Sequence, residues 1–189
     1  MKQRYKINNL LELKVPELTD AKKLYELIEH SRQEMQKWLP WVKKTLSAAD
    51  EEAFILYSLG RIQDGKLWSM TICVDGVPAG SIDIHEINVQ NAHGQIGYWL
   101  GSRFQGKGIM TQTLEATVAI AFEELGLHRL ELIADNNNQK SKAVAVRAGF
   151  AFNCILQDYL LSQDGFHDAV LYSKLSALKK PQFIEPINL

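Results

Sequence analysis

The chain has 189 residues, a formal net charge of −1 and 23% charged residues. This length suffices for one domain with a substantial buried core. A charge this close to zero gives no electrostatic reason to expect direct nucleic-acid binding, and no segment approaches the ~20 apolar residues that a membrane-spanning helix requires. Because the N-terminal residues also lack the apolar core of a signal peptide, we expect a soluble, cytoplasmic protein.

The first quarter of the chain predicts one strand followed by helices. Residues 5–15 are strand-like, and Asp20 is a suitable cap for a helix that extends to about His30. A second helical region covers 31–39 and ends before Pro40, because proline cannot continue a helix.

A third helix and a hairpin come next. Ser47 and Asp50 resemble a capping box for a helix that ends near Ile62. Residues 67–75 and 79–87 are rich in strand formers and are separated by an Asp-Gly turn, which is a strong signal for a tight hairpin.

The remaining segments complete a β-α-α-β-β-β-α-β-α-β-β order. We expect strands at 94–101, 128–134, 153–161 and 166–175, and helices at 109–125 and 139–148. This order predicts a single α/β (α+β) domain over residues 1–178, with a mixed, mostly antiparallel sheet of about six to seven strands and helices on both faces. Residues 179–189 are expected to form a C-terminal tail.

Both cysteines lie in apolar strand-like segments. Cys73 and Cys154 are isolated from one another in the sequence. We therefore interpret them as reduced packing residues without a chemical role.

The run IGYWLGSRFQGKGIMT, from Ile96 to Thr111, joins a predicted strand to a predicted helix through a glycine-rich loop. A glycine-rich bend at a helix start leaves backbone N–H groups without partners and favours bound anions, above all a pyrophosphate. Glycines also let the main chain approach such a ligand closely. The loop therefore predicts a nucleotide-diphosphate site.

Three phosphate-binding patterns can be compared with this loop. A Walker loop requires Ser or Thr directly after its lysine, but Lys107 is followed by Gly108. A dinucleotide-binding loop requires a third glycine where Thr111 stands. The pattern R/Q-x-x-G-x-G/A fits Arg103, Gly106 and Gly108, and it resembles the acetyl-coenzyme A loop of the GNAT acetyltransferase superfamily. An ordinary glycine-rich turn is the alternative for this hexamer alone.

Four separated segments resemble one GNAT branch, the RimJ/RimL-type ribosomal-protein N-terminal acetyltransferases. They are WLPWV at 38–42, the strand and loop at 96–111, NQKSKAVAVRAGF at 138–150 and FHDAVLYS at 166–173. The resemblance implies the GNAT fold, in which the strand at 94–101 splays away from the strand at 128–134 to admit the cofactor. It also implies an acetyl-CoA-dependent N-acetyltransferase.

The resemblance assigns cofactor-binding positions. The pyrophosphate would be held by backbone amides of Gln105, Gly106, Lys107, Gly108 and Ile109, with Met110 and Thr111 nearby. The main chain of Trp99, Leu100 and Gly101 would pair with the pantetheine arm as an added strand does. Arg103 and Lys107 could add side-chain contacts to the phosphates, although exposed basic side chains are commonly only solvated.

Asn138 and Ser141 match the family's N-x-x-S at a helix start. The resemblance places Asn138 on the pantetheine arm and Ser141 near the sulfur, whereas helix capping is the alternative for both. Many GNAT enzymes carry a tyrosine as general acid where this chain has Ala145. Ser141 is therefore the candidate acid, expected to donate a hydrogen bond more than a full proton.

No general base stands out in the sequence. Related sequences often carry glutamate where this chain has Gln95, and an amide cannot serve as a base. Asp83, His85 and Glu86 are candidates for the base or for acceptor binding, with ordinary strand positions as the alternative. Strand alternation places Glu86 on the face opposite Asp83 and His85.

The resemblance implies that the helical region covers the acceptor end of the site. His30, Trp38 and Trp41 are the candidate substrate-binding residues, and core packing is the alternative for both tryptophans. An N-terminal α-amine is partly neutral at pH 7, because its pKa is ~7.7–8.0 against ~10.4 for lysine, and so it needs little help from a base.

We therefore expect acetyl transfer to the N-terminal amine of a ribosomal or similar protein. A small-amine (polyamine or antibiotic) acetyltransferase and a non-catalytic acyl-CoA-binding module are the alternatives. No metal is expected, and a homodimer is compatible with the resemblance.

Overall fold

The computed structural model describes residues 2–162 and 164–177, which form an eight-stranded sheet with helices on both faces. The strands are β1 (Arg4–Lys6), β2 (Leu11–Lys14), β3 (Trp68–Val74), β4 (Val77–Asn88), β5 (His93–Leu100), β6 (Arg129–Asp135), β7 (Ala151–Leu161) and β8 (Phe166–Leu175). The helices are α1 (Ala21–Met35), α2 (Ala48–Gln63), α3 (Ile109–Glu123) and α4 (Gln139–Arg147), with short 3-10 turns η1 (Leu18–Asp20), η2 (Pro40–Lys43) and η3 (Ser102–Phe104).

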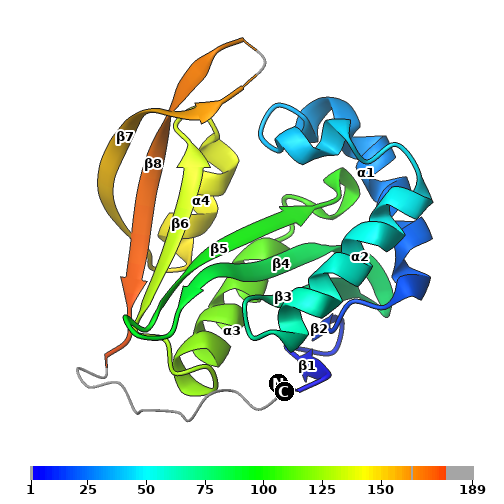
Figure 1. Cartoon of the computed structure of the whole chain (residues 1–189), viewed down its shortest axis with the longest axis horizontal. Coiled ribbons are helices and arrows are strands. Elements are labelled where there is room, and N and C mark those ends of the chain that lie inside the picture. Colours follow the sequence, from blue (N-terminus) through cyan, green and yellow to red (C-terminus); the bar gives the residue numbers. More distant parts are fainter. Residues whose placement is uncertain (1, 163, 178–189) are drawn as a thin grey trace.

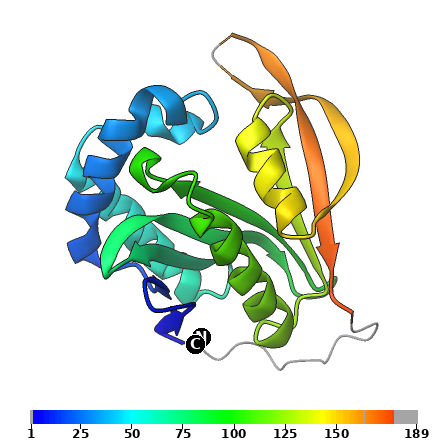
Figure 2. The same ribbon diagram turned by 180° about the vertical axis from the view of Figure 1, so that it is seen from behind.

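The strand order across the sheet is β1-β2-β3-β4-β5-β6-β8-β7. Neighbouring strands are antiparallel except β5 and β6, which are parallel. Figures 1 and 2 show α1 and α2 over one face of the sheet and α3 and α4 over the other. The mixed sheet and the two helical layers confirm the predicted fold class.

The main core lies between the sheet and α3. Alternate residues of the central strands, among them Ile82, Ile84 and Ile96, pack there against Leu114 of α3. The opposite face carries smaller apolar clusters under α1 and α2, and Trp99 of β5 packs against both of them. Because side chains alternate along a strand, β5 contributes to both layers.

The sheet opens between β5 and β6. Their pairing is confined to the segment from His93 to Gln95 on β5 and from Arg129 to Glu131 on β6. Beyond these residues the two strands diverge, as Figure 1 shows. This divergence, referred to below as the gap, confirms the predicted splay.

The Asp-Gly hairpin between β3 and β4 forms as predicted. Asp75 and Gly76 both have positive φ, at 53° and 72°, as a two-residue turn with the twist of a hairpin requires. The predicted cap of α2 is also present, since the side chain of Ser47 accepts a hydrogen bond from the N–H of Asp50.

Two boundaries near the N-terminus were wrong. The predicted strand over 5–15 is two short strands, because the side chain of Asn8 accepts hydrogen bonds from Leu10 and Leu11 N–H groups and turns the chain. The first strand counts separately, so the described sheet has eight strands instead of six or seven. The two helices expected at 20–30 and 31–39 are one helix, α1, which continues through His30 to Met35.

Cys73 is buried and Cys154 is exposed. Burial raises the pKa of the Cys73 thiol to about 11, as expected of a packing residue. The same expectation was wrong for Cys154, because β7 is an edge strand whose side chains are mostly exposed.

The predicted tail at 179–189 lies outside the described residues. Within the described residues, no helix is long and apolar enough to cross a membrane.

Candidate active site

The glycine-rich loop follows β5 and leads into α3. Gly106 and Gly108 both have a φ of 74°, a left-handed conformation that glycine adopts without strain. Gly108 is the N-cap of α3 and supplies no side-chain cap. Within the described residues, the N–H groups of 106–111 have no backbone acceptor, whereas the Gln105 N–H donates to the carbonyl of Ser102 at 3.1 Å. The free amides therefore begin one residue later than the sequence analysis placed them.

The basic side chains of the loop are exposed. The guanidinium of Arg103 lies over the Phe104 ring, 4.6 Å from its centroid, and Lys107 is exposed as well. Phosphate contacts by these two side chains stay predictions.

Alternate residues of β5 direct backbone groups into the gap. The N–H of Gly101 donates to the carbonyl of Ala79 at 2.9 Å, on the β4 side. Because successive residues of a strand direct these groups to opposite edges, those of Trp99 also point to β4, and those of Tyr98 and Leu100 point to the gap. Of the three residues assigned to the pantetheine arm, Leu100 therefore directs its main chain there, although its carbonyl already accepts from the side-chain amide of Gln105 at 3.0 Å.

Asn138 and Ser141 lie at the start of α4, across the gap from β5. The side chain of Asn138 accepts a hydrogen bond from the Ser141 N–H at 3.1 Å, so the capping interpretation of Asn138 is confirmed. Oγ of Ser141 lies 2.9 Å from the phenolic oxygen of Tyr98. The sequence analysis missed Tyr98, although the alternation of β5 places it on the α4 face, opposite Trp99.

Two further polar side chains of α4 reach the glycine-rich loop. Lys140 contacts the carboxylate of Glu34 on α1 and the side-chain oxygen of Gln105, the latter at 3.1 Å. Arg147 donates to the hydroxyl of Thr111 in the first turn of α3 at 3.3 Å. These contacts join segments far apart in the chain, so no local pattern indicated them.

Asp83, His85 and Gln95 form a hydrogen-bonded group on the α1–α2 face. The His85 ring contacts Asp83 Oδ1 through Nδ1 at 2.6 Å and Gln95 Oε1 through Nε2 at 2.8 Å. A Cβ added to Gly97 would lie 3.2–3.3 Å from the Asp83 carboxylate and the His85 ring, so this group lies directly beside the strand that borders the gap.

The hydrogen bond to Asp83 is the main cause that raises the pKa of His85. Both ring nitrogens of His85 are thus engaged by neighbouring side chains, and the charged imidazole can donate from both. A role of His85 as general base stays a prediction.

Replacing His85 by glutamine should change how stability depends on pH. The charged ring is favoured in the folded state by Asp83 and, more weakly, by Glu86. Its stabilisation is complete below its unfolded pKa of ~6.5 and is lost as pH rises through the higher folded pKa. We expect His85→Gln to lower the melting temperature more at pH 6 than at pH 9, with a contribution below ~1 kcal/mol because the ring is partly exposed. An equal loss at both pH values would contradict this expectation.

Glu86 does not follow simple strand alternation. Its φ is 48°, and the β4–β5 register shifts between His85 and Asn88. A bulge of this kind redirects side chains, so the alternation that placed Glu86 opposite His85 is interrupted at this residue.

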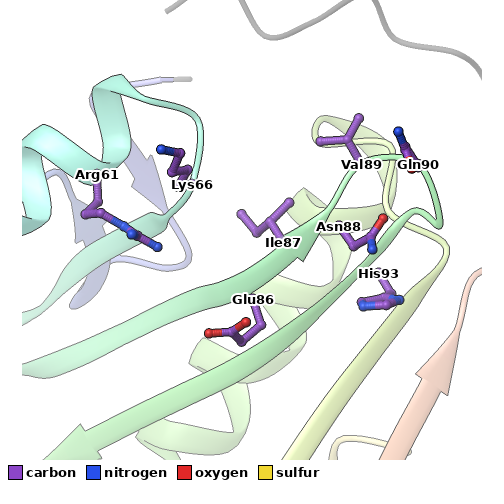
Figure 3. A pocket seen from close by; sticks show the side chains of 8 residues that line it. All are labelled: Arg61, Lys66, Glu86, Ile87, Asn88, Val89, Gln90 and His93. Atoms are coloured by element: carbon purple, nitrogen blue, oxygen red, sulfur yellow. The ribbon is translucent and has the colours of Figure 1, made fainter.

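Glu86 instead lines a pocket of about 510 Å³ at the end of the sheet remote from the glycine-rich loop (Figure 3). Its lining residues are Arg61, Lys66, Glu86, Ile87, Asn88, Val89, Gln90 and His93. Strand β5 begins beside this pocket, at His93, and reaches the glycine-rich loop only at its other end. This pocket is therefore separate from the gap.

The residues predicted to cover the acceptor lie in and after α1. The Trp41 ring contacts the Trp99 ring, with centroids 6.1 Å apart, so the segment after α1 covers β5 on the Asp83 side. Trp38 is half-buried, and His30 is exposed with its Nδ1 2.6 Å from the carbonyl of Glu26. Their contact with an acceptor stays a prediction.

The β7–β8 hairpin pairs with β6 along the whole length of that strand. His167 of β8 lies between the carboxylates of Asp135, at 2.6 Å, and Asp164, at 2.9 Å. The hydrogen bond to Asp135 is the main cause that raises the pKa of His167. The conspicuous FHDAVLYS segment thus anchors the hairpin beside the turn that leads to Ser141.

A family model, the acetyltransferase (GNAT) domain, matches residues 11–151. The chain belongs to the GNAT acetyltransferase family. It is thus an N-acetyltransferase, and the family resemblance found in the sequence is confirmed. Within the described residues, no cluster of His, Cys, Asp and Glu side chains could hold a metal ion.

Two curated relatives are similar to this chain over almost its whole length. The putative ribosomal N-acetyltransferase YdaF of Bacillus subtilis (strain 168) is 33% identical over 177 residues, which cover 90% of this chain and 93% of the relative. The ribosomal-protein-serine acetyltransferase of Escherichia coli (strain K12) is 27% identical over 93% of this chain and 98% of the relative.

A solved structure has the same fold. The microcin C7 self immunity acetyltransferase MccE, in complex with acetyl-CoA and AMP, superimposes with a TM-score of 0.88 at 29% identity. The match covers 93% of this chain and 98% of that one.

Proposed function

We propose that this GNAT enzyme transfers the acetyl group of acetyl-CoA to the N-terminal α-amine of a ribosomal or similar protein. The observation that carries the proposal is the juxtaposition of free amides at 106–111 with a gap where β5 has lost its parallel partner. A diphosphate and an extended amide-bearing arm are the two groups that these features suit.

The residues at the gap fit the parts of acetyl-CoA. The amides of 106–111 would hold the pyrophosphate, and a Cβ at Gly106 would meet no atom within 4 Å, so the loop surface there is open to a ligand. Backbone groups of Tyr98 and Leu100 would pair with the pantetheine amides. The sulfur would then lie near Ser141, and the acetyl group near Gly97 and Asp83.

Nucleophilic attack requires a neutral amine. About a tenth of N-terminal α-amines are neutral at pH 7, against fewer than one lysine in a thousand, given pKa values of ~7.7–8.0 and ~10.4. Both ring nitrogens of His85 are engaged, by Asp83 and by Gln95. An acceptor that needs little deprotonation suits such a site, and an N–H of β5 near Leu100 would stabilise the negative charge that develops on the thioester oxygen.

The charge of the acceptor face argues against a polyamine. Asp83 is paired with His85, whose pKa is raised, so the pair attracts an ammonium group less than a free carboxylate would. The spermidine N(1)-acetyltransferase of Escherichia coli (strain K12) is similar over 41% of this chain only. The names of the nearly full-length relatives, YdaF and the ribosomal-protein-serine acetyltransferase, favour a ribosomal-protein acceptor.

The acceptor class can be tested by following free thiol release from acetyl-CoA. We expect saturating turnover with peptides that carry a free N-terminus and none with the same peptides blocked at that amine. Internal lysine in the blocked peptide serves as the matched control. Turnover on polyamines or aminoglycosides but not on peptides would reject the proposed acceptor, and binding of acetyl-CoA without thiol release from any amine would favour a non-catalytic module.

Two further expectations about partners stay predictions. A homodimer would cover exposed apolar side chains of the edge strand β7, among them Phe152, Ile155 and Tyr159. Direct nucleic-acid binding is not expected of a chain with a net charge of −1.

A further inference from the structure

Tyr98 and Ser141 make a contact that crosses the gap. Tyr98 belongs to the part of β5 that has left β6, and Ser141 lies in the first turn of α4, which follows β6. Their hydroxyl oxygens are 2.9 Å apart, and the carbonyl of Ser141 is 3.4 Å from the phenol. This contact joins the two arms of the sheet at the level where a thioester would pass between them.

The direction of the hydrogen bond decides what Ser141 can do. If Tyr98 donates to Oγ of Ser141, the serine hydroxyl hydrogen is free to point elsewhere. Hydrogen bonds in such a chain polarise one another. The Ser141 hydroxyl then becomes a stronger donor toward any anion in the gap.

We propose that Tyr98 is a positioning residue for acetyl transfer, which donates to Oγ of Ser141 and thereby directs the Ser141 hydroxyl hydrogen at the departing thiolate. This inference rests on the placement of the sulfur near Ser141 in the proposed function. Many GNAT enzymes carry a tyrosine at the helix position where this chain has Ala145. Here Tyr98 supplies a phenol at the site from β5 instead.

The reaction balances without a proton from either hydroxyl. The amine nitrogen forms a bond to the carbonyl carbon, the carbon–sulfur bond breaks, and its electron pair leaves on sulfur. The nitrogen releases one proton to solvent, and the thiolate takes one from solvent. Ser141 stabilises the sulfur anion through a hydrogen bond while the C–S bond breaks.

The acidities of the groups support hydrogen bonding over proton transfer. Burial raises the pKa of Tyr98 to about 12, whereas an ordinary thiol has a pKa of ~8.5. A proton on the phenol is therefore more tightly held than one on the departing sulfur. The hydrogen bond with Ser141 and, after it, the charge of Arg147 lower the pKa of Tyr98 as smaller, opposing effects.

Three variants of the full chain test the inference: Tyr98→Phe, Ser141→Ala and the double variant. Phenylalanine keeps the ring and its packing and removes only the hydroxyl. We expect Tyr98→Phe to lower kcat about tenfold while KM for acetyl-CoA changes less than about twofold, the size expected for one hydrogen bond made in the transition state. Because the phenol acts through Ser141, the double variant should be within about twofold of Ser141→Ala.

A matched control removes a phenol hydroxyl elsewhere. Tyr25 donates to the carbonyl of Leu46 at 2.8 Å, so Tyr25→Phe should leave kcat unchanged. A purely structural bridge would predict a different pattern, in which Tyr98→Phe raises KM for acetyl-CoA and lowers the melting temperature, and its effect persists in the Ser141→Ala background.

The rates are measured with whichever amine the wild-type enzyme acetylates, so that a wrong acceptor class does not affect the result. An unchanged kcat in Tyr98→Phe, or losses that multiply in the double variant, would overturn the role of Tyr98 and leave the proposed function standing. A wild-type enzyme that releases thiol with no amine would overturn both.

Discussion

Gly106→Glu and Gly108→Glu should each weaken acetyl-CoA binding by about 100-fold, the loss expected when charged hydrogen bonds are replaced by repulsion. Both glycines lie where the free amides of the loop begin, and α3 starts directly after Gly108. A carboxylate there would place negative charge where the helix dipole and the amides favour a diphosphate. Calorimetric titration with coenzyme A measures the effect without depending on the acceptor.

A control must separate charge at the site from backbone strain. A non-glycine residue in the left-handed region costs roughly 1–2 kcal/mol wherever it occurs. Gly65, after α2, has a φ of 67° and open space around its Cβ position, so Gly65→Glu carries the same strain and the same charge away from the loop. We expect Gly65→Glu to bind coenzyme A within about threefold of wild type, because its strain and its charge lie away from the glycine-rich loop.

A second control keeps the size of the side chain and removes its charge. Gly106→Gln should bind coenzyme A more tightly than Gly106→Glu and less tightly than wild type, because the uncharged amide adds bulk without repulsion. Equal affinities of Gly106→Glu and Gly65→Glu would show that the diphosphate lies elsewhere.

Local patterns in the sequence predicted much of the framework. Turn residues with positive φ, such as Asp75 and Gly76, fix a hairpin by their own conformational preference. The alternation of side chains along β5 gives way to a glycine-rich helix start at Gly108. This change likewise involves only neighbouring residues. Signals of this kind are readable because their energetics are local.

The errors arose where neighbouring residues do not decide the outcome. Neither His30 nor Ser31 interrupts a helix. The chain leaves α1 only after Met35, whose carbonyl accepts from the N–H groups of Trp38 and Leu39. Leu39 is extended before Pro40, as residues preceding proline usually are. The proline therefore marked the end of one helix and gave no evidence for two.

The candidate site depended on contacts between distant segments. The second nitrogen of His85 is engaged because β4 and β5 pair in a register that brings Gln95 to it. Tyr98 contacts Ser141, 43 residues away in sequence, because the divergence of β5 and β6 brings it to α4. Neither the register nor the divergence can be read from the residues themselves.

Gly80→Ala should have the largest effect on stability among the glycine substitutions. A Cβ at this position would lie 2.2 Å from the carbonyl oxygen of Trp99 and 2.9 Å from Cα of Leu100. Both are backbone atoms, so no side-chain rotation relieves the clash. Strands β4 and β5 must move apart at the Gly80–Leu100 pair, and we expect a loss of ~3 kcal/mol in the free energy of unfolding, at the upper end for overpacking.

The same substitution at Gly60 should have the opposite sign. Gly60 lies in α2, is exposed, and a Cβ there would meet no atom within 4 Å. Alanine is favoured over glycine inside a helix by roughly 0.5–1 kcal/mol, so Gly60→Ala should stabilise the protein by about that amount. Urea unfolding of both variants measures the difference directly, and two shifts of the same sign would contradict the close approach of β4 and β5. Because Leu100 directs its backbone groups into the gap, Gly80→Ala should also weaken coenzyme A binding, while Gly60→Ala should leave it unchanged.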